Sequence, residues 1–188
     1  MTKNIMIVGV GGQGTLLTSR ILGGLAITGG YDVKLSEVHG MAQRGGSVVT
    51  YVKYGDRVYS PIIDRGEADI ILAFEMLEAY RAMPYVKKGG KIIVNTQEIS
   101  PMPVITGAMQ YPQNIAQKIS SKVNLTCVDA LKLAKEAGNI KAVNVALIGV
   151  MAKNTDIAYD KWINTIKTTV PEKFLDVNLK AFDKGYNL

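Results

Sequence analysis

A glycine-rich turn between an expected strand and an expected helix is the feature that most constrains the fold. The apolar residues 5–8 predict a buried strand, and residues 13–28 have helical spacing of apolar side chains that ends at Gly29 and Gly30. Residues 9–14 between them read Gly-Val-Gly-Gly-Gln-Gly. Glycines there permit a tight turn and close approach of a phosphate, which the helix N-terminus attracts. Alone, the pattern is equally compatible with dinucleotide binding and with a turn that binds nothing.

Further strand and helix patterns alternate along the chain, which predicts an α/β fold. Strands are expected at residues 33–38, 47–54, 68–74, 91–95 and 123–128, and helices at 75–83, 113–121, 130–137, 140–153, 160–170 and 172–184. Gly55 and Asp56 followed by residues 57–59 suggest a hairpin, so the sheet should be mixed. The segment 100–112 is rich in proline and suggests a loop with a short strand at Val104 and Ile105.

We therefore expect a three-layer, Rossmann-like domain with a mostly parallel, mixed sheet. Residues 1–188 are interpreted as a single domain, in which residues 153–188 form a C-terminal helical tail.

The loop after the second expected strand carries an unusual set of functional groups. A carboxylate, an imidazole, an amide and a guanidinium follow one another closely, and glycines frame them: Glu37, His39, Gln43, Arg44, Gly45, Gly46 and then Ser47. Arginine presents a planar fork to phosphate or carboxylate, and histidine can move a proton. The alternative is a tight loop with an internal Glu37–Arg44 ion pair. We favour a ligand or interface role, because the loop should emerge beside the glycine turn, where sites in such sheets gather.

Glu37 could also bind a ribose in a dinucleotide site. Two features argue against nicotinamide or flavin: Gly12 and Gln13 are extra residues in the turn, and the following loop is not one that a dinucleotide fold requires.

Charge and composition exclude several function classes. The formal net charge is +6, but residues 1–81 are neutral and the excess lies in scattered residues of the second half. Dispersed lysines usually keep a domain soluble, so we expect no nucleic-acid partner. The longest apolar stretch, residues 143–152, is too short for a membrane helix of about 20 residues. No secretory signal is visible, and we expect a cytoplasmic protein without membrane contact.

The cysteine and histidine content bears on metals. Cys127 is the only cysteine and His39 the only histidine, so a disulfide, an iron–sulfur cluster and a Cys/His zinc site are excluded within this chain. No metal site is predicted. Cys127 and Trp162 are both expected in the core.

The glycine turn and the loop together carry a resemblance. Gly-Val-Gly-Gly-Gln-Gly (residues 9–14) and Ser-Glu-Val-His-Gly-Met-Ala-Gln-Arg-Gly-Gly-Ser-Val (residues 36–48) resemble the small, beta subunit of indolepyruvate:ferredoxin oxidoreductase, within the gamma-domain family of 2-oxoacid:ferredoxin oxidoreductases. Shorter matches include Ala-Phe-Glu (residues 73–75) and Ala-Val-Asn (residues 142–144). The resemblance covers about residues 4–153, so the tail is unmatched.

The resemblance implies a subunit that is inactive alone. The family decarboxylates 2-oxoacids on thiamine diphosphate, passes electrons through iron–sulfur clusters to ferredoxin and delivers the acyl group to coenzyme A. For this branch it implies aryl pyruvates, indolepyruvate foremost, in aromatic amino acid catabolism. Thiamine diphosphate and the clusters are expected on a large alpha subunit, which agrees with the single cysteine of this chain. Self-association of the isolated chain is left open.

By the same resemblance, this chain helps to bind coenzyme A and to close the active site. The expected cofactor-binding residues are Gly9, Gly11, Gly12, Gln13, Gly14, Glu37, Gln43, Arg44, Gly45, Gly46 and Ser47. Arg44 is the expected anion contact, Gln13 and Gln43 would give orienting hydrogen bonds, and His39 is the one candidate for a catalytic role. The alternatives are a gamma subunit for pyruvate, 2-oxoglutarate or 2-oxoisovalerate, a stand-alone dinucleotide-binding module, and a purely structural assembly subunit.

Overall fold

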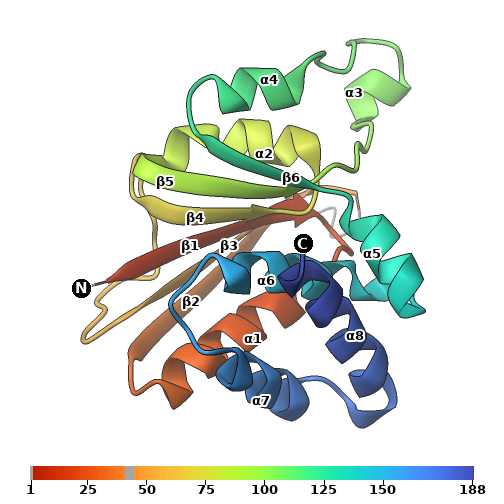
Figure 1. Ribbon diagram of the computed structural model, residues 1–188. Helices are drawn as coiled ribbons and strands as arrows, with labels where there is room; N and C mark the ends of the chain where they lie inside the picture. The colour runs from red at the N-terminus through yellow and green to blue at the C-terminus, as the bar shows by residue number, and fades with distance from the viewer. Residues whose placement is uncertain (1, 41–44) are drawn as a thin grey trace.

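The glycine turn joins the first strand to the first helix, as expected. The computed structural model describes residues 2–40 and 45–188 (Figure 1). Strand β1 (Lys3–Val10) is buried along most of its length, and α1 (Thr15–Thr28) follows after the turn. The other strands are β2 (Asp32–His39), β3 (Ser47–Gly55), β4 (Ala68–Ala73), β5 (Val86–Asn95) and β6 (Asn124–Val128). The other helices are α2 (Met76–Ala82), α3 (Met102–Ile105), α4 (Ile115–Ser120), α5 (Ala130–Ala137), α6 (Val143–Lys153), α7 (Tyr159–Thr169) and α8 (Leu175–Tyr186), with short 3₁₀ helices at Met83–Tyr85, Ile140–Ala142 and Glu172–Phe174.

The sheet is mixed and mostly parallel, which confirms the prediction. Its strands lie in the order β2-β3-β1-β4-β5-β6. The pairs β1–β4, β4–β5 and β5–β6 are parallel, whereas β3 is antiparallel to both β1 and β2. One end of the sheet, at the carboxyl ends of the parallel strands, therefore brings together the glycine turn, the ends of β4, β5 and β6, and the start of β3.

The origin of the antiparallel strand was predicted wrongly. Residues 57–59 do not return as a strand, because β3 already has β2 and β1 as partners on its two sides. The Val58 N–H instead donates to Asp32 Oδ2 at 2.8 Å. The hairpin is formed by β2 and β3, whose register runs from Asp32–Gly55 to His39–Val48. The strand expected at Val104 and Ile105 is also wrong, since both residues belong to helix α3.

Helices cover both faces of the sheet, which gives the three layers that the alternating pattern predicts. Helices α1, α6, α7 and α8 lie on one face, and α2, α3 and α4 lie on the other (Figure 1). None of the helices in the described residues has the length and apolarity needed to cross a bilayer.

The C-terminal helices contribute to the core. Trp162 in α7 and Phe182 in α8 are 1% and 0% exposed, so the prediction for Trp162 is confirmed. Helix α8 crosses α6 at two glycines: a Cβ atom on Gly149 would lie 2.2 Å from Phe182 O, and one on Gly185 would lie 2.0 Å from Ala146 O. The two helix backbones are therefore in direct contact. Cys127, in contrast, is exposed, because β6 is an edge strand with no further strand on its outer side among residues 2–40 and 45–188, so the prediction of burial is wrong.

Candidate functional site

A groove of about 380 Å³ lies beside the glycine turn. It brings together five of the predicted residues and three others, and is lined by Gly11, Gly12, Gly14, Thr15, Leu16, Glu37, His39 and Val48. The groove lies at the carboxyl ends of the parallel strands, which is the position at which ligands bind in open α/β sheets.

The turn itself has the geometry of an anion site. Gly12 and Gly14 have φ values of 100° and 87°, which only glycine adopts readily. A Cβ atom on Gly12 would meet no atom of the described residues within 4 Å, so these residues leave the backbone open to a ligand. Gly14 is the N-cap of α1, where no described side chain caps the helix and no acid occupies the first turn. The first N–H groups of the helix are thus available, in the positive potential of its N-terminus.

Asn144, which is distant from the turn in the sequence, holds the turn in place. Its Nδ2 donates to Gly14 O at 3.4 Å, and a Cβ atom on Gly14 would lie 2.9 Å from that nitrogen. Asn144 is buried in α6, and its Oδ1 has no hydrogen-bond partner within the described part of the chain. The resemblance includes this residue, but 130 positions separate the pair and local patterns cannot connect them.

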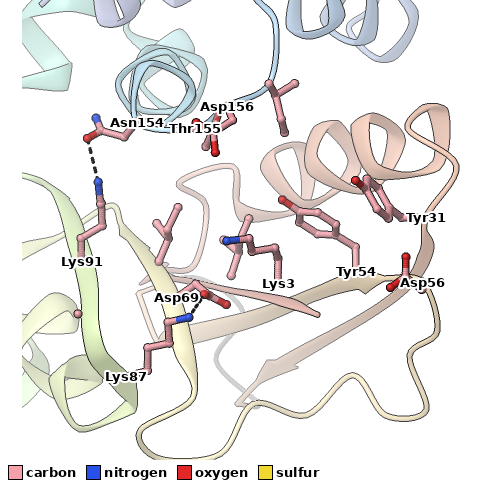
Figure 2. A pocket seen from close by; sticks show the side chains of 14 residues that line it. Lys3, Tyr31, Tyr54, Asp56, Asp69, Lys87, Lys91, Asn154, Thr155 and Asp156 are labelled. Carbon is pink, nitrogen blue, oxygen red and sulfur yellow. Dashed lines mark hydrogen bonds and ion pairs between the residues drawn. The ribbon is translucent and has the colours of Figure 1, made fainter. Parts of the chain in front are cut away.

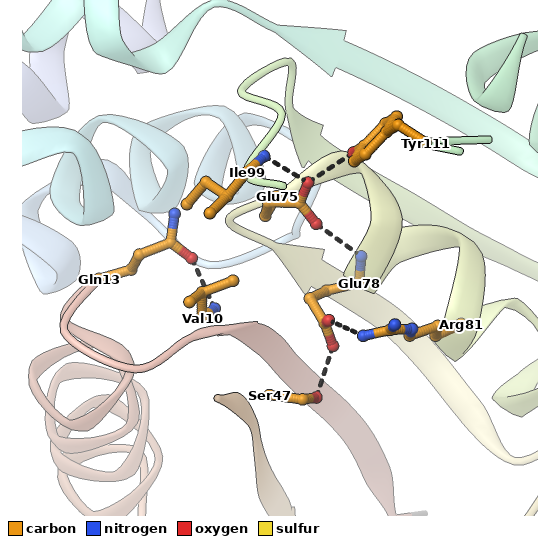
Figure 3. A network of polar contacts seen from close by, with 8 residues as sticks. All are labelled: Val10, Gln13, Ser47, Glu75, Glu78, Arg81, Ile99 and Tyr111. Atoms are coloured by element: carbon orange, nitrogen blue, oxygen red, sulfur yellow. Dashed lines mark hydrogen bonds and ion pairs between the residues drawn. The ribbon is translucent and has the colours of Figure 1, made fainter. Parts of the chain in front are cut away.

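Gly9 and Gln13 build the turn and do not line the groove. Gln13 Oε1 accepts from the Val10 N–H at 2.7 Å, and Gln13 Nε2 donates to Phe74 O at 3.2 Å (Figure 3). A Cβ atom on Gly9 would lie 2.8 Å from Gln13 Oε1. The amide therefore braces β1 against the end of β4, and the ligand contact of Gln13 stays a prediction.

The loop after β2 is joined to the turn through its glycines. The Gly11 N–H donates to Gly46 O at 2.9 Å, and Gly45 has a φ of 80°. Gln43 and Arg44 lie outside the described residues, and so does the alternative Glu37–Arg44 ion pair. The prediction of an anion contact by Arg44 stays a prediction.

Glu37 and His39 face the groove without forming a catalytic arrangement. Glu37 Oε2 accepts a long hydrogen bond of 3.4 Å from the Thr50 hydroxyl. His39 is exposed, and its Nδ1 lies 3.3 Å from Gly40 O. A general base is normally oriented by a second polar side chain. Within the described residues, no carboxylate orients His39, and its catalytic role stays a prediction.

Ser47 belongs to a second polar network behind the groove (Figure 3). Its hydroxyl donates to Glu78 Oε2 at 2.5 Å, and Arg81 donates to Glu78 Oε1 at 2.6 Å. The predicted ligand-binding serine therefore ties the start of β3 to α2. No group of three or more His, Cys, Asp or Glu side chains suitable for a metal occurs within residues 2–40 and 45–188.

Glu75 forms the buried part of this network. It is 1% exposed and caps α2, with Oε2 accepting from the Glu78 N–H at 2.8 Å. Its Oε1 accepts from the Ile99 N–H at 3.0 Å and from the Tyr111 hydroxyl at 2.7 Å. The sequence places Glu75 at the start of the expected helix 75–83, but it gives no signal for the partners of Glu75 at residues 99 and 111.

The contact with Glu75 predicts a pH effect. Burial, and then the hydrogen bond to Glu75, raises the pKa of Tyr111 well above its ordinary value. The unfolded chain releases this proton near pH 10, whereas the native protein keeps it, so the free energy of unfolding should fall as the pH rises above about 10. In Tyr111→Phe, denaturant titrations from pH 8 to 11 should show a shallower fall, with the exposed Tyr59→Phe as control. An equally steep fall in both variants would contradict this.

Comparison with known proteins identifies the family. The family described as pyruvate ferredoxin/flavodoxin oxidoreductase matches residues 4–188, including the C-terminal helices that the sequence resemblance left unmatched. The chain is 44% identical to the indolepyruvate oxidoreductase subunit IorB of Pyrococcus horikoshii, over 97% of this chain and 93% of that protein. The chain is 42% identical to the subunit IorB of Thermococcus kodakarensis, over 97% of this chain and 93% of that protein. To the pyruvate/ketoisovalerate oxidoreductases common subunit gamma of that organism it is 25% identical, over 95% and 92%.

A solved structure supports the fold. The keto/oxoacid ferredoxin oxidoreductase gamma subunit from Geobacter sulfurreducens superimposes with a TM-score of 0.73 at 24% identity, over 98% of this chain and 96% of that chain. The expected family and fold are both confirmed. The chain, with its glycine turn braced by Gln13 and Asn144, belongs to the pyruvate ferredoxin/flavodoxin oxidoreductase family.

Proposed function

We propose that this chain is the small subunit of an indolepyruvate:ferredoxin oxidoreductase that converts aryl pyruvates to arylacetyl-CoA in the cytoplasm. The observation that carries the substrate class is the contrast within one organism: the chain is 42% identical to the indolepyruvate subunit and 25% identical to the gamma subunit shared by pyruvate and ketoisovalerate enzymes. Both comparisons span nearly the whole chain, so the difference is not an effect of coverage.

The redox centres fit the partner subunit and not this chain. A cluster needs about four thiolates, and Cys127 is alone on the exposed edge strand. Thiamine diphosphate on the large subunit would stabilise the carbanion that decarboxylation leaves. The residues of this chain serve the other substrate, coenzyme A, whose pyrophosphate matches the free N–H groups at the start of α1.

Each groove residue then has a binding role. Gly12 and Gly14 have no side chains that would keep phosphate oxygens away from the backbone N–H groups, and Asn144 holds Gly14 in place. Glu37 and His39 provide polar contacts at the rim of the groove. Arg44 adds a fixed positive charge from the adjoining loop, which suits a phosphate. Gln43 would give an orienting hydrogen bond.

The experiment is reconstitution with the large subunit. The isolated chain should be colourless and inactive, and the mixture should reduce ferredoxin when indolepyruvate and coenzyme A are both present. Activity with pyruvate, 2-oxoglutarate or 2-oxoisovalerate, and with no aryl pyruvate, would assign the chain to another branch of the family. Tight binding of NAD or FAD to the isolated chain would support a stand-alone dinucleotide module instead.

The role in coenzyme A binding has its own test. Arg44→Ala should raise the KM for coenzyme A about tenfold, the cost of one charge-assisted contact, with a smaller change in kcat. Arg65→Ala removes an exposed arginine outside the groove and is the matched control. If Arg44→Ala weakens assembly of the two subunits and leaves the KM for coenzyme A unchanged, the loop is an assembly surface.

A further inference from the structure

A second, larger cleft lies at the opposite end of the sheet, at the amino ends of the parallel strands. Two adjoining cavities of about 620 and 270 Å³ form it, and they share Ile5, Tyr31, Tyr54, Thr155, Asp156 and Ile157. We call it the basal cleft. The first strand, the end of β3, the starts of β4 and β5 and the segment after α6 surround it (Figure 2). Its size is in the range of small-molecule sites.

The inner part of the basal cleft is apolar and aromatic. Leu25, Met151 and Trp162 line it together with the two tyrosines. The rings of Tyr31 and Tyr54 are 5.6 Å apart and tilted by 54°, and Trp162 is 1% exposed. An aromatic ring is the group that makes the best contacts with such a surface.

Two hydrogen-bond donors, the Trp162 indole and the Tyr54 hydroxyl, belong to residues that line the inner cavity. The buried indole N–H of Trp162 has no partner within the described part of the chain. Burial, and then the neighbouring Tyr31, raises the pKa of Tyr54, so its hydroxyl stays a donor. A buried donor that lacks a partner is costly, so an acceptor that reached the indole N–H would relieve that cost.

The mouth of the cleft carries charges of both signs, because Lys3, Lys87 and Lys91 line it together with Asp56, Asp69 and Asp156. Asp69 is paired with Lys87 and also accepts from the Asn4 N–H at 2.8 Å. Lys91 donates to the neutral Asn154 at 3.0 Å and has no carboxylate partner within the described residues. In Figure 2, Lys3 is seen between Lys91 and Tyr54, with Thr155 and Asp156 across the cleft.

We propose that the basal cleft binds a small aromatic carboxylate, with its ring against Tyr31 and Tyr54, beside the buried Trp162, and its carboxylate at Lys3 and Lys91. An arylacetate anion and an aromatic amino acid share this chemistry. Asp156 offers an acceptor for the ammonium group of the second. The groove beside the glycine turn lies at the carboxyl ends of the strands, away from the basal cleft, so this proposal and the proposed function can be tested independently.

The single tryptophan of the chain provides the readout. Phenylacetate and phenylalanine, which do not absorb at the excitation wavelength of tryptophan, are titrated into the full chain while Trp162 fluorescence is recorded. 2-Phenylethanol, which lacks both the carboxylate and the ammonium group, is the negative control. Saturable quenching by one of the acids and none by 2-phenylethanol is expected. Tighter binding of phenylalanine identifies the amino acid as the ligand type, and tighter binding of phenylacetate identifies the simple anion.

Variants locate the site. Lys3→Met should weaken binding about tenfold, while Lys88→Met, which removes an exposed lysine outside the cleft, should leave it unchanged. Lys91→Met provides a second probe of the same charge, and thermal melting checks that each variant folds. Equal binding in Lys3→Met, Lys91→Met and Lys88→Met would overturn the proposal. So would the absence of saturable quenching, or displacement of the acid by coenzyme A.

Discussion

Gly149→Ala should lower the free energy of unfolding by about 3 kcal/mol, the upper range for overpacking a close contact. The new Cβ atom would lie 2.2 Å from Phe182 O and 2.8 Å from Tyr186 N. Both atoms belong to the backbone of α8, so no side-chain rotation relieves the overlap and the helices must separate. Alanine gains about 1 kcal/mol of helix propensity over glycine, which offsets only part of the loss.

Chemical denaturation followed by circular dichroism measures this effect. Gly24→Ala in α1 is the matched control, because its new Cβ atom would lie 3.2 Å from a side-chain methyl, Thr165 Cγ2, which can move slightly. The control should change stability by less than about 1 kcal/mol. Equal stability of Gly149→Ala and the control would show that α6 and α8 are not in backbone contact.

Glu75→Ala should also cost about 3 kcal/mol, for a different reason. The carboxylate accepts from the Glu78 and Ile99 N–H groups and from the Tyr111 hydroxyl, and its removal leaves these three donors without their partner. The segment from Ile99 to Tyr111 would lose two of its attachments to α2. We therefore expect faster proteolysis there as well as lower stability.

Glu98→Ala separates this effect from a general loss of negative charge. Glu98 is exposed and lies one residue from Ile99, so its removal should leave both stability and proteolysis nearly unchanged. If Glu75→Ala were as stable as Glu98→Ala, the network would contribute nothing measurable to the fold.

Sequence patterns were sufficient for features that depend on neighbours in the chain. The apolar run of β1, the glycine turn and the start of α1 follow one another directly, so their geometry could be anticipated. The segment at Val104 failed because β-branched residues favour strands only where a partner strand exists. That segment lies outside the sheet, and after Pro101 it forms a short helix.

The sequence predicted which residues line the candidate site better than it predicted the contacts that those residues make. Gly11, Gly12, Gly14, Glu37 and His39 line one groove, as the adjacent strand ends suggested. The contacts of Gln13 with Val10 and Phe74, at the two ends of its amide, were not anticipated, because Phe74 lies 61 residues away. Asn144 and Glu75 act through contacts between distant segments, and a single sequence contains no signal for such pairs.

The reversed direction of β3 has a consequence for how this protein can vary. Both ends of the connection between β2 and β3 are held by paired strands, His39 opposite Val48, with the Gly46 carbonyl also bound to Gly11. Residues added to or removed from the middle of that connection would leave the strand register unchanged, and the entropy of closing a loop grows only slowly with its length. The length of this connection can therefore vary between related proteins while the pairing of β2 and β3 stays the same.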